Sequence, residues 1–293
     1  MDLLRTAANP WGQDVLVGIG WDLVWLAVIG AAAFVVLHTV VVRVRGGARL
    51  DTAPHPDEVP PDQRVERHSA SARAFHWIMS LSMFGLLITA FVPVLGWEFA
   101  WVELHWISGM LLLAAVVYHV IHAIGWQDFW SMWMGPSDVK DSVTELKAAM
   151  LPGSDPGHRT GKYPADHKLY HHMAATASIV AIATGLLMMV RIDTPFWTRN
   201  PYLLSDGMWG VMYVLHGLSG VALIGLVVAH VYFAVRPEKR WLTWSMVRGW
   251  ITREKYHAHF DPTRWKVDGD ERVESGTGGA LASAAPQAPR DEG

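Results

Sequence analysis

The chain has 293 residues, of which 51% are hydrophobic and only 17% are charged, and its formal net charge is −3. This balance is too apolar for an ordinary soluble domain and indicates a membrane protein, surrounded by lipid and without a nucleic-acid partner. Because there is no cysteine, the chain itself can hold no disulfide, covalently attached c-type haem, iron–sulfur cluster or cysteine-based zinc site.

Five apolar blocks are long enough to cross a bilayer, for which a helix needs about 20 residues. None carries Asp, Glu, Lys or Arg through its centre, whereas histidine lies within or beside each block. In chain order the blocks are residues 21–42, 77–95, 106–125, 173–190 and 211–235. The first runs well past the roughly 7–15 apolar residues of a signal peptide, so we predict a retained span.

Lysine and arginine are distributed unevenly between the two sides of the predicted spans. Of the 24 basic residues, only Arg5, Arg191 and Arg199 fall on the side that holds the N-terminus. Cytoplasmic segments of membrane proteins are enriched in Lys and Arg. The sequence therefore predicts a multi-pass protein of the cell (inner) membrane, with its N-terminus outside and its C-terminus in the cytoplasm.

Histidines on the third and fifth spans have a spacing typical of haem ligands. His216 and His230 are 14 residues apart, which is nearly four helical turns, and face the same side of the fifth span. His105, near the start of the third span, lies at the depth of His216, and facing imidazoles of this kind can ligate one haem iron. Gly109 and Gly220 follow one turn later, where glycine lets a flat porphyrin approach the backbone. The alternative is that these glycines serve helix packing alone.

Two residues compete to pair with His230 at the other membrane border. His76 lies near the start of the second span, and Arg73, one turn earlier, can pair with a haem propionate. His119 lies 14 residues after His105 and reaches the same depth on the third span. The spacing leaves both open. Four further histidines are expected to be interfacial residues without an iron: His38, His122, His171 and His172.

Residues from about 67 to 265 resemble the cytochrome b (gamma) subunit of membrane-bound formate dehydrogenases. The matching pieces are Arg-x-x-His-Trp at 73–77, Leu-His with a following glycine at 104–109, Gly-Lys-Tyr at 161–163, and Leu-His-x-x-x-Gly with a second histidine at 215–230. The broader di-haem family also includes the cytochromes of hydrogenases and thiosulfate reductases.

This resemblance implies two haems b and a quinone site. One haem would have His105 and His216 as axial ligands, and the other His76 and His230, with His119 kept as the alternative to His76. Menaquinone or ubiquinone would bind on the cytoplasmic side at four candidate residues: Gly161, Lys162, Tyr163 and His167. The family's Asn and Gln in this loop are replaced by Pro164 and His167, so the individual quinone contacts stay open.

The expected fold is an all-α, integral membrane protein: a four-helix di-haem bundle with one extra N-terminal membrane helix. We expect the N-terminal helix in residues 1–45, a cytoplasmic linker in 46–72 that is extended around 51–62, the bundle in 73–266 and a disordered tail in 267–293. The resemblance implies a subunit without substrate chemistry of its own apart from quinone reduction.

The implied partners are an iron–sulfur subunit and a molybdenum or tungsten catalytic subunit. A hydrogenase, thiosulfate reductase or other molybdoenzyme is the first alternative to a formate dehydrogenase. The second alternative, from another class, is a haem-free membrane anchor or transporter whose histidines relay protons.

Overall fold

The computed structural model describes residues 2–44, 58–126, 129–150 and 159–267. In this part of the chain, five helices are long and apolar enough to cross a membrane, which confirms the predicted all-α membrane fold. They are α1 (Trp21–Val44), α2 (Ala70–Phe91, continued by the 3-10 turn Val92–Leu95), α3 (Trp101–Trp126), α5 (Ala165–Met189) and α6 (Asp206–Val235).

Four of these helices begin five to eight residues earlier than the apolar blocks predicted. The side chains of Ser69 and Ser205 cap α2 and α6 by accepting hydrogen bonds from Ala72 N and Met208 N. These serine side chains satisfy free N–H groups at the start of each helix. The first turns they cap are polar, so a search for apolar blocks leaves these turns out. As a result, His76 and His105 lie in the second turns of their helices.

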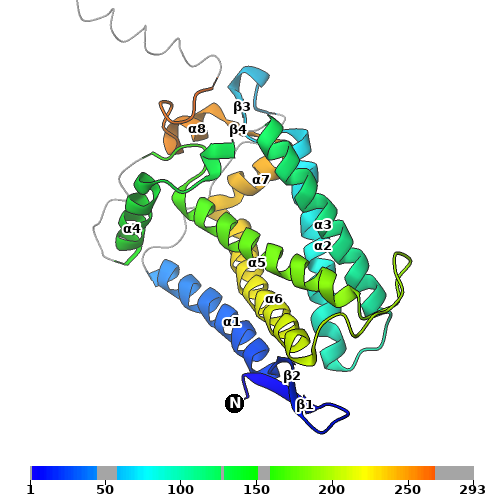
Figure 1. The fold of residues 1–293 in the computed structure, drawn as a ribbon. Coiled ribbons are helices and arrows are strands. Elements are labelled where there is room, and N and C mark those ends of the chain that lie inside the picture. Colours follow the sequence, from blue (N-terminus) through cyan, green and yellow to red (C-terminus); the bar gives the residue numbers. More distant parts are fainter. Residues whose placement is uncertain (1, 45–57, 127–128, 151–158, 268–293) are drawn as a thin grey trace, which may run out of the picture.

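The bundle consists of two helix pairs, α2 with α3 and α5 with α6, and α1 packs against α6 (Figure 1). Small residues set the approach within the first pair, since a Cβ on Gly85 of α2 would lie 2.6 Å from Ser108 Oγ of α3. Many large apolar side chains remain exposed on the outer surface of the helices, as expected of surfaces that contact lipid.

A β-hairpin precedes α1 and covers one end of the bundle, here called the hairpin end. Strands β1 (Leu4–Ala8) and β2 (Asp14–Ile19) pair antiparallel, and β2 packs against the start of α6. Glycines on α6 make room for it, because a Cβ on Gly210 or Gly217 would lie 2.6 Å from Leu16 or 2.8 Å from Ile19. The sequence analysis did not predict this hairpin.

Polar side chains attach the other end of α1 to α6. Nδ1 of His38 lies 2.9 Å from an Arg236 nitrogen, from which it accepts a hydrogen bond, and 2.9 Å from the Tyr232 hydroxyl. Thr39 Oγ1 lies 3.0 Å from the same hydroxyl. The N-terminal unit is therefore held to α6 both by its hairpin and by His38.

At the opposite end, segments from distant parts of the chain form a small cap. Strand β3 (Arg64–Glu66) pairs antiparallel with β4 (Trp250–Thr252), which α7 (Arg240–Arg248) precedes and α8 (Arg253–His259) follows. The cap has its own buried cluster of Val65, Ile251, Tyr256 and Phe260. The predicted linker, residues 46–72, thus contains a strand. Most of its expected extended stretch, 51–62, lies outside the described residues, and so does the predicted tail, 267–293, apart from its first residue.

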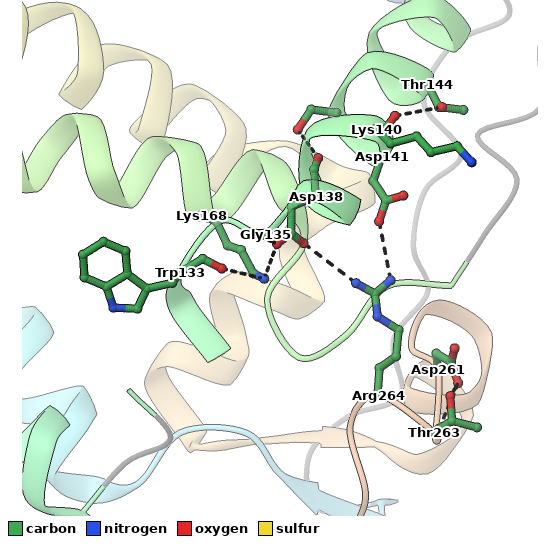
Figure 2. Close-up of polar contacts among 11 residues, drawn as sticks. Trp133, Gly135, Asp138, Lys140, Asp141, Thr144, Lys168, Asp261, Thr263 and Arg264 are labelled. Carbon is green, nitrogen blue, oxygen red and sulfur yellow. Dashed lines mark hydrogen bonds and ion pairs between the residues drawn. The ribbon is translucent and has the colours of Figure 1, made fainter. Parts of the chain in front are cut away.

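Helix α4 (Pro136–Met150) is tied to the cap end of α5 by an ion-pair network (Figure 2). Lys168 Nζ lies 2.8 Å from Asp138 Oδ2 and donates to the Trp133 carbonyl at 3.2 Å. Arg264 lies 3.8 Å from Asp138 and 3.5 Å from Asp141. Burial alone would raise the pKa of Asp138, but the hydrogen bonds from Lys168 and the Gly135 N–H outweigh it, so this pKa lies below its ordinary value.

Candidate functional site

The imidazoles of His105 on α3 and His216 on α6 face each other near the hairpin end. Their ring centroids are 6.1 Å apart, with an angle of 67° between the ring planes. A metal–imidazole bond is about 2.0–2.1 Å long, so two rings that share one metal ion have centroids roughly 6 Å apart. The separation therefore fits one iron held between the two side chains.

A threonine on the neighbouring helix holds each of these imidazoles. Thr89 Oγ1 of α2 lies 2.8 Å from His105 Nδ1, and Thr184 Oγ1 of α5 lies 3.0 Å from His216 Nδ1. Each hydroxyl also donates to a carbonyl of its own helix, at 2.7 Å to Gly85 O and 2.6 Å to Val180 O. Since a hydroxyl has one proton to donate, it accepts from Nδ1–H, which leaves Nε2 unprotonated and available to a metal.

The space beside Gly109 and Gly220 is open, as a flat cofactor requires. Among the described residues, a Cβ on Gly109 would meet only Leu86 Cδ2, at 3.9 Å, and a Cβ on Gly220 would meet nothing within 4 Å. Close helix packing is therefore not what these two glycines provide. The residues at the hairpin-side pair fit a haem.

A second pair lies near the cap end, where His76 of α2 faces His230 of α6. The ring centroids are 6.2 Å apart and the ring planes are inclined by 49°. Tyr170 of α5 stacks on His230 at 5.0 Å. Nδ1 of His76 is buried and has no hydrogen-bond partner within the described ranges, so this pair has no counterpart of Thr89.

His119 faces a different partner from the one considered in the sequence analysis. Its ring lies 6.2 Å from that of His171 on α5, and Phe75 stacks on it at 4.1 Å. Because Phe75 adjoins His76, the pairs His76–His230 and His119–His171 lie side by side. The two pairs draw on the contacting helices α2 and α3, so both are candidates to hold the cap-side haem.

The remaining histidines contact other aromatic or polar groups. His122 stacks between Tyr118 and Trp126 of its own helix. His172 Nδ1 lies 2.7 Å from the carbonyl of Lys168. In the part of the chain that the structure describes, neither faces a histidine across the bundle in the manner of His105 or His76.

The predicted propionate and quinone residues lie at the cap end, close to the His76–His230 pair. Arg73 donates from Nη1 to Val247 O at 2.6 Å, and its Nε is buried without a partner in the described part of the chain. The ammonium of Lys162 lies 5.7 Å from the Tyr163 ring centroid, and Gly161 packs against Arg264. His167 occupies the first turn of α5.

Sequence reasoning missed Thr89, Thr184 and Arg67. The two threonines act on histidines of other helices, so no local spacing marks them, although a hydroxyl at 3% or 4% exposure within an apolar helix is a hint that it has a partner. Arg67 was counted only as a basic residue of the linker, because nothing in the sequence shows that it is buried.

Facing imidazoles on separate apolar helices define a class of protein, the membrane cytochromes that bind b-type haem. Residues 67–249, more than half of the chain, match the family described as prokaryotic cytochrome b561. The chain belongs to this family and is a multi-pass membrane protein whose haem b carries electrons. A comparison with curated proteins found no match. The family match begins directly after β3 ends and stops directly before β4, so the hairpin, α1 and both strands of the cap lie outside it.

Proposed function

We propose that the protein is the di-haem cytochrome b subunit of a formate dehydrogenase-type respiratory complex. The observation that carries the proposal is the presence of two facing imidazole pairs at opposite ends of one bundle, His105–His216 and His76–His230. Electrons from an iron–sulfur partner would enter at the hairpin end, cross the bundle and reduce menaquinone or ubiquinone at the cap end.

The chain's own residues would hold and orient the cofactors. The four histidines would be the axial ligands, and Thr89 and Thr184 would fix the tautomer of the hairpin-side imidazoles. Each bound haem would supply a one-electron carrier whose potential is set by its ligands and surroundings. Near the cap-side pair, Lys162 and His167 would hydrogen-bond the quinone.

The distribution of charge supports a cytoplasmic cap and an outer hairpin end. The cap and its borders are rich in Lys and Arg, as cytoplasmic segments are. At the hairpin end, an open surface hollow of about 620 Å³ between the start of α3 and the segment after α5 is lined by Glu103 and Asp193, among others. We expect the iron–sulfur subunit, and with it a molybdenum or tungsten subunit, to dock at this end.

Haem quantification of the purified protein tests the proposal. A pyridine haemochrome assay should give about two haems b per chain, with a reduced-minus-oxidised spectrum of b type. One haem per chain would remove one of the two pairs, and none would favour the haem-free anchor or transporter. Reduction of the haems in native membranes by formate, but not by hydrogen or thiosulfate, would support the formate dehydrogenase partner over its alternatives.

A further inference from the structure

Arg67, at the end of β3, is a buried cation with one N–H group left without a partner. Only 3% of the residue is exposed. Nη2 donates to Lys162 O at 3.2 Å, Nε donates to His68 Nε2 at 3.3 Å, and the guanidinium lies 4.9 Å from the Phe260 ring centroid. Nη1 is buried and has no hydrogen-bond partner among the described residues.

No carboxylate of the described residues pairs with this guanidinium. Burial lowers the pKa of Arg67 to about 10, and Tyr163 offsets this effect in part, so the side chain stays positively charged at neutral pH. A buried charge without a counter-ion is costly. An arginine at such a position therefore indicates that an anion binds beside it.

Arg67 and Arg73 lie close together at Gly249, since Arg67 N donates to Gly249 O at 2.8 Å and a Cβ on Gly249 would lie 3.3 Å from Arg73 Nε. Burial lowers the pKa of His68 to about 3, and the neighbouring Arg67 adds to the effect, so the imidazole that accepts from Arg67 Nε is neutral and does not balance its charge. Arg73, one turn before His76, has a second buried N–H, at Nε, with no partner in the described ranges.

We propose that Arg67 and Arg73 together bind the propionate carboxylates of the cap-side haem. This inference rests on the proposed function, and it adds Arg67 as a positioning residue. Two unpaired guanidinium N–H groups match two carboxylates in charge and donor type. A quinone oxygen is neutral and would leave the buried charges uncompensated, so the geometry favours the haem edge over the quinone.

The same contact connects haem binding to the cap. The backbone N–H groups of Arg67 and His68 both donate to Gly249 O, at 2.8 and 2.9 Å. Arg67 also bonds to the Gly161–Tyr163 loop through Lys162 and rests on Phe260 of the cap cluster. Neutralising Arg67 with a carboxylate should therefore hold β3, β4 and the C-terminal segment in place.

The test is a redox titration of purified Arg67→Gln, Arg67→Lys and Arg64→Gln proteins, each with its haem content measured first. Arg64 is the matched control, since it lies on the same strand but bonds to Val59 O and packs over Trp250. In Arg67→Gln, loss of a cation should disfavour the ferrous cap-side haem about tenfold, which is 59 mV for one electron. Arg67→Lys should keep most of the potential, and the hairpin-side haem should not move.

Loading apo-protein with haem dimethyl ester, which lacks the carboxylates, separates this role from a structural one. With haem, Arg67→Gln should retain the cap-side cofactor less well than wild type, because an ion pair to a propionate is lost. With the ester, Arg67→Gln should retain it at least as well as wild type, because no carboxylate is left to pair with Arg67. An equal loss of retention with haem and with its ester would overturn the proposal, as would unchanged potentials in Arg67→Gln. If wild type contains no haem at all, the proposed function itself is wrong. If Arg67→Gln does not fold, the Arg67→Lys protein provides the test. Lysine keeps the positive charge, so a full loss of the cap-side haem in Arg67→Lys would exclude a role of Arg67 that is based on charge.

Discussion

The hairpin-side and cap-side imidazoles differ in what holds them. His105 and His216 each donate to a threonine hydroxyl, whereas Nδ1 of His76 has no partner in the described part of the chain. Hydrogen bonds of this kind fix ring orientation and make the imidazole a more basic ligand. We therefore expect the hairpin-side haem to be held more rigidly than the cap-side haem.

Removing one threonine hydroxyl should alter only the hairpin-side haem. Thr89→Val keeps the side-chain shape but leaves His105 Nδ1–H without an acceptor, so the ligand becomes less basic and the ferric state is less stabilised. We expect this haem to bind about tenfold more weakly and to have a higher midpoint potential, measured by spectroelectrochemistry. Ser82→Ala is the control, since Ser82 is a buried hydroxyl on the same helix whose hydrogen bond among the described residues goes to Ile78 O. Equal potentials in wild type and Thr89→Val would contradict the role of Thr89.

The choice between His76 and His119 can be decided by paired substitutions. His76→Ala should lose the cap-side haem and quinone reduction, because His76 faces His230 and has Arg73 one turn away. His119→Ala should retain both, with at most a shifted potential, and His171→Ala should behave in the same way. Haem content and the reduced spectrum measure the outcome. If His119→Ala strips the haem and His76→Ala does not, the haem lies between His119 and His171 instead.

The sequence located the histidines by depth but could not orient them. Spacing along α3 and α6 placed His105 level with His216, and the two face each other. Whether His76 or His119 faces α6 depends on the rotation of α2 and α3 about their axes. That rotation is set by contacts between helices, such as Gly85 against Ser108, which no periodicity within one helix reports.

Among the secondary-structure elements, the turn from α7 into β4 depends on one glycine. Gly249 has φ +94°, and a Cβ there would lie 2.9 Å from His68 O and 3.3 Å from Arg73 Nε. Gly249→Ala should therefore strain the backbone, at a cost of about 1–2 kcal/mol, and loosen the pairing of β3 with β4. Faster hydrogen exchange in both strands would show this.

A matched substitution separates this effect from a general loss of stability. Gly225→Ala in α6 is the control, because a Cβ at Gly225 meets no described atom within 4 Å. Unchanged exchange in Gly249→Ala, or equal changes in the two variants, would contradict the prediction.

The membrane helices could be predicted from the sequence, whereas the two small sheets could not. Apolar blocks of span length are a strong local signal, and only the polar first turns were left out. Strand β3 has three residues, and its partner β4 lies at the far end of the bundle in sequence. Pairing over such a distance has no local signature, and the Pro- and Asp-rich stretch before β3 favoured a plain linker.

For the whole molecule, the uneven charge predicts the orientation in the membrane. A fluorescent protein that folds only in the cytoplasm should be active when it is fused after residue 267, and a phosphatase that needs export should be inactive there. In the segment between α2 and α3, the phosphatase should be active and the fluorescent protein inactive. The physical reason is the retention of Lys- and Arg-rich segments in the cytoplasm. An active phosphatase at the C-terminal position would reverse the assignment of the cap and hairpin ends.

Hydrogen bonds from Arg67 N and His68 N to Gly249 O join the two ends of the segment that matches the family, residues 67–249. Two chain ends that meet in this way can be linked directly, and units with adjoining ends tolerate permutation and insertion. The bundle could thus be rewired as a circular permutant, with a short bridge from β4 back to β3 and new ends in the segment between α2 and α3. The hairpin and α1 lie outside this closed segment, so deleting them should leave its two ends joined.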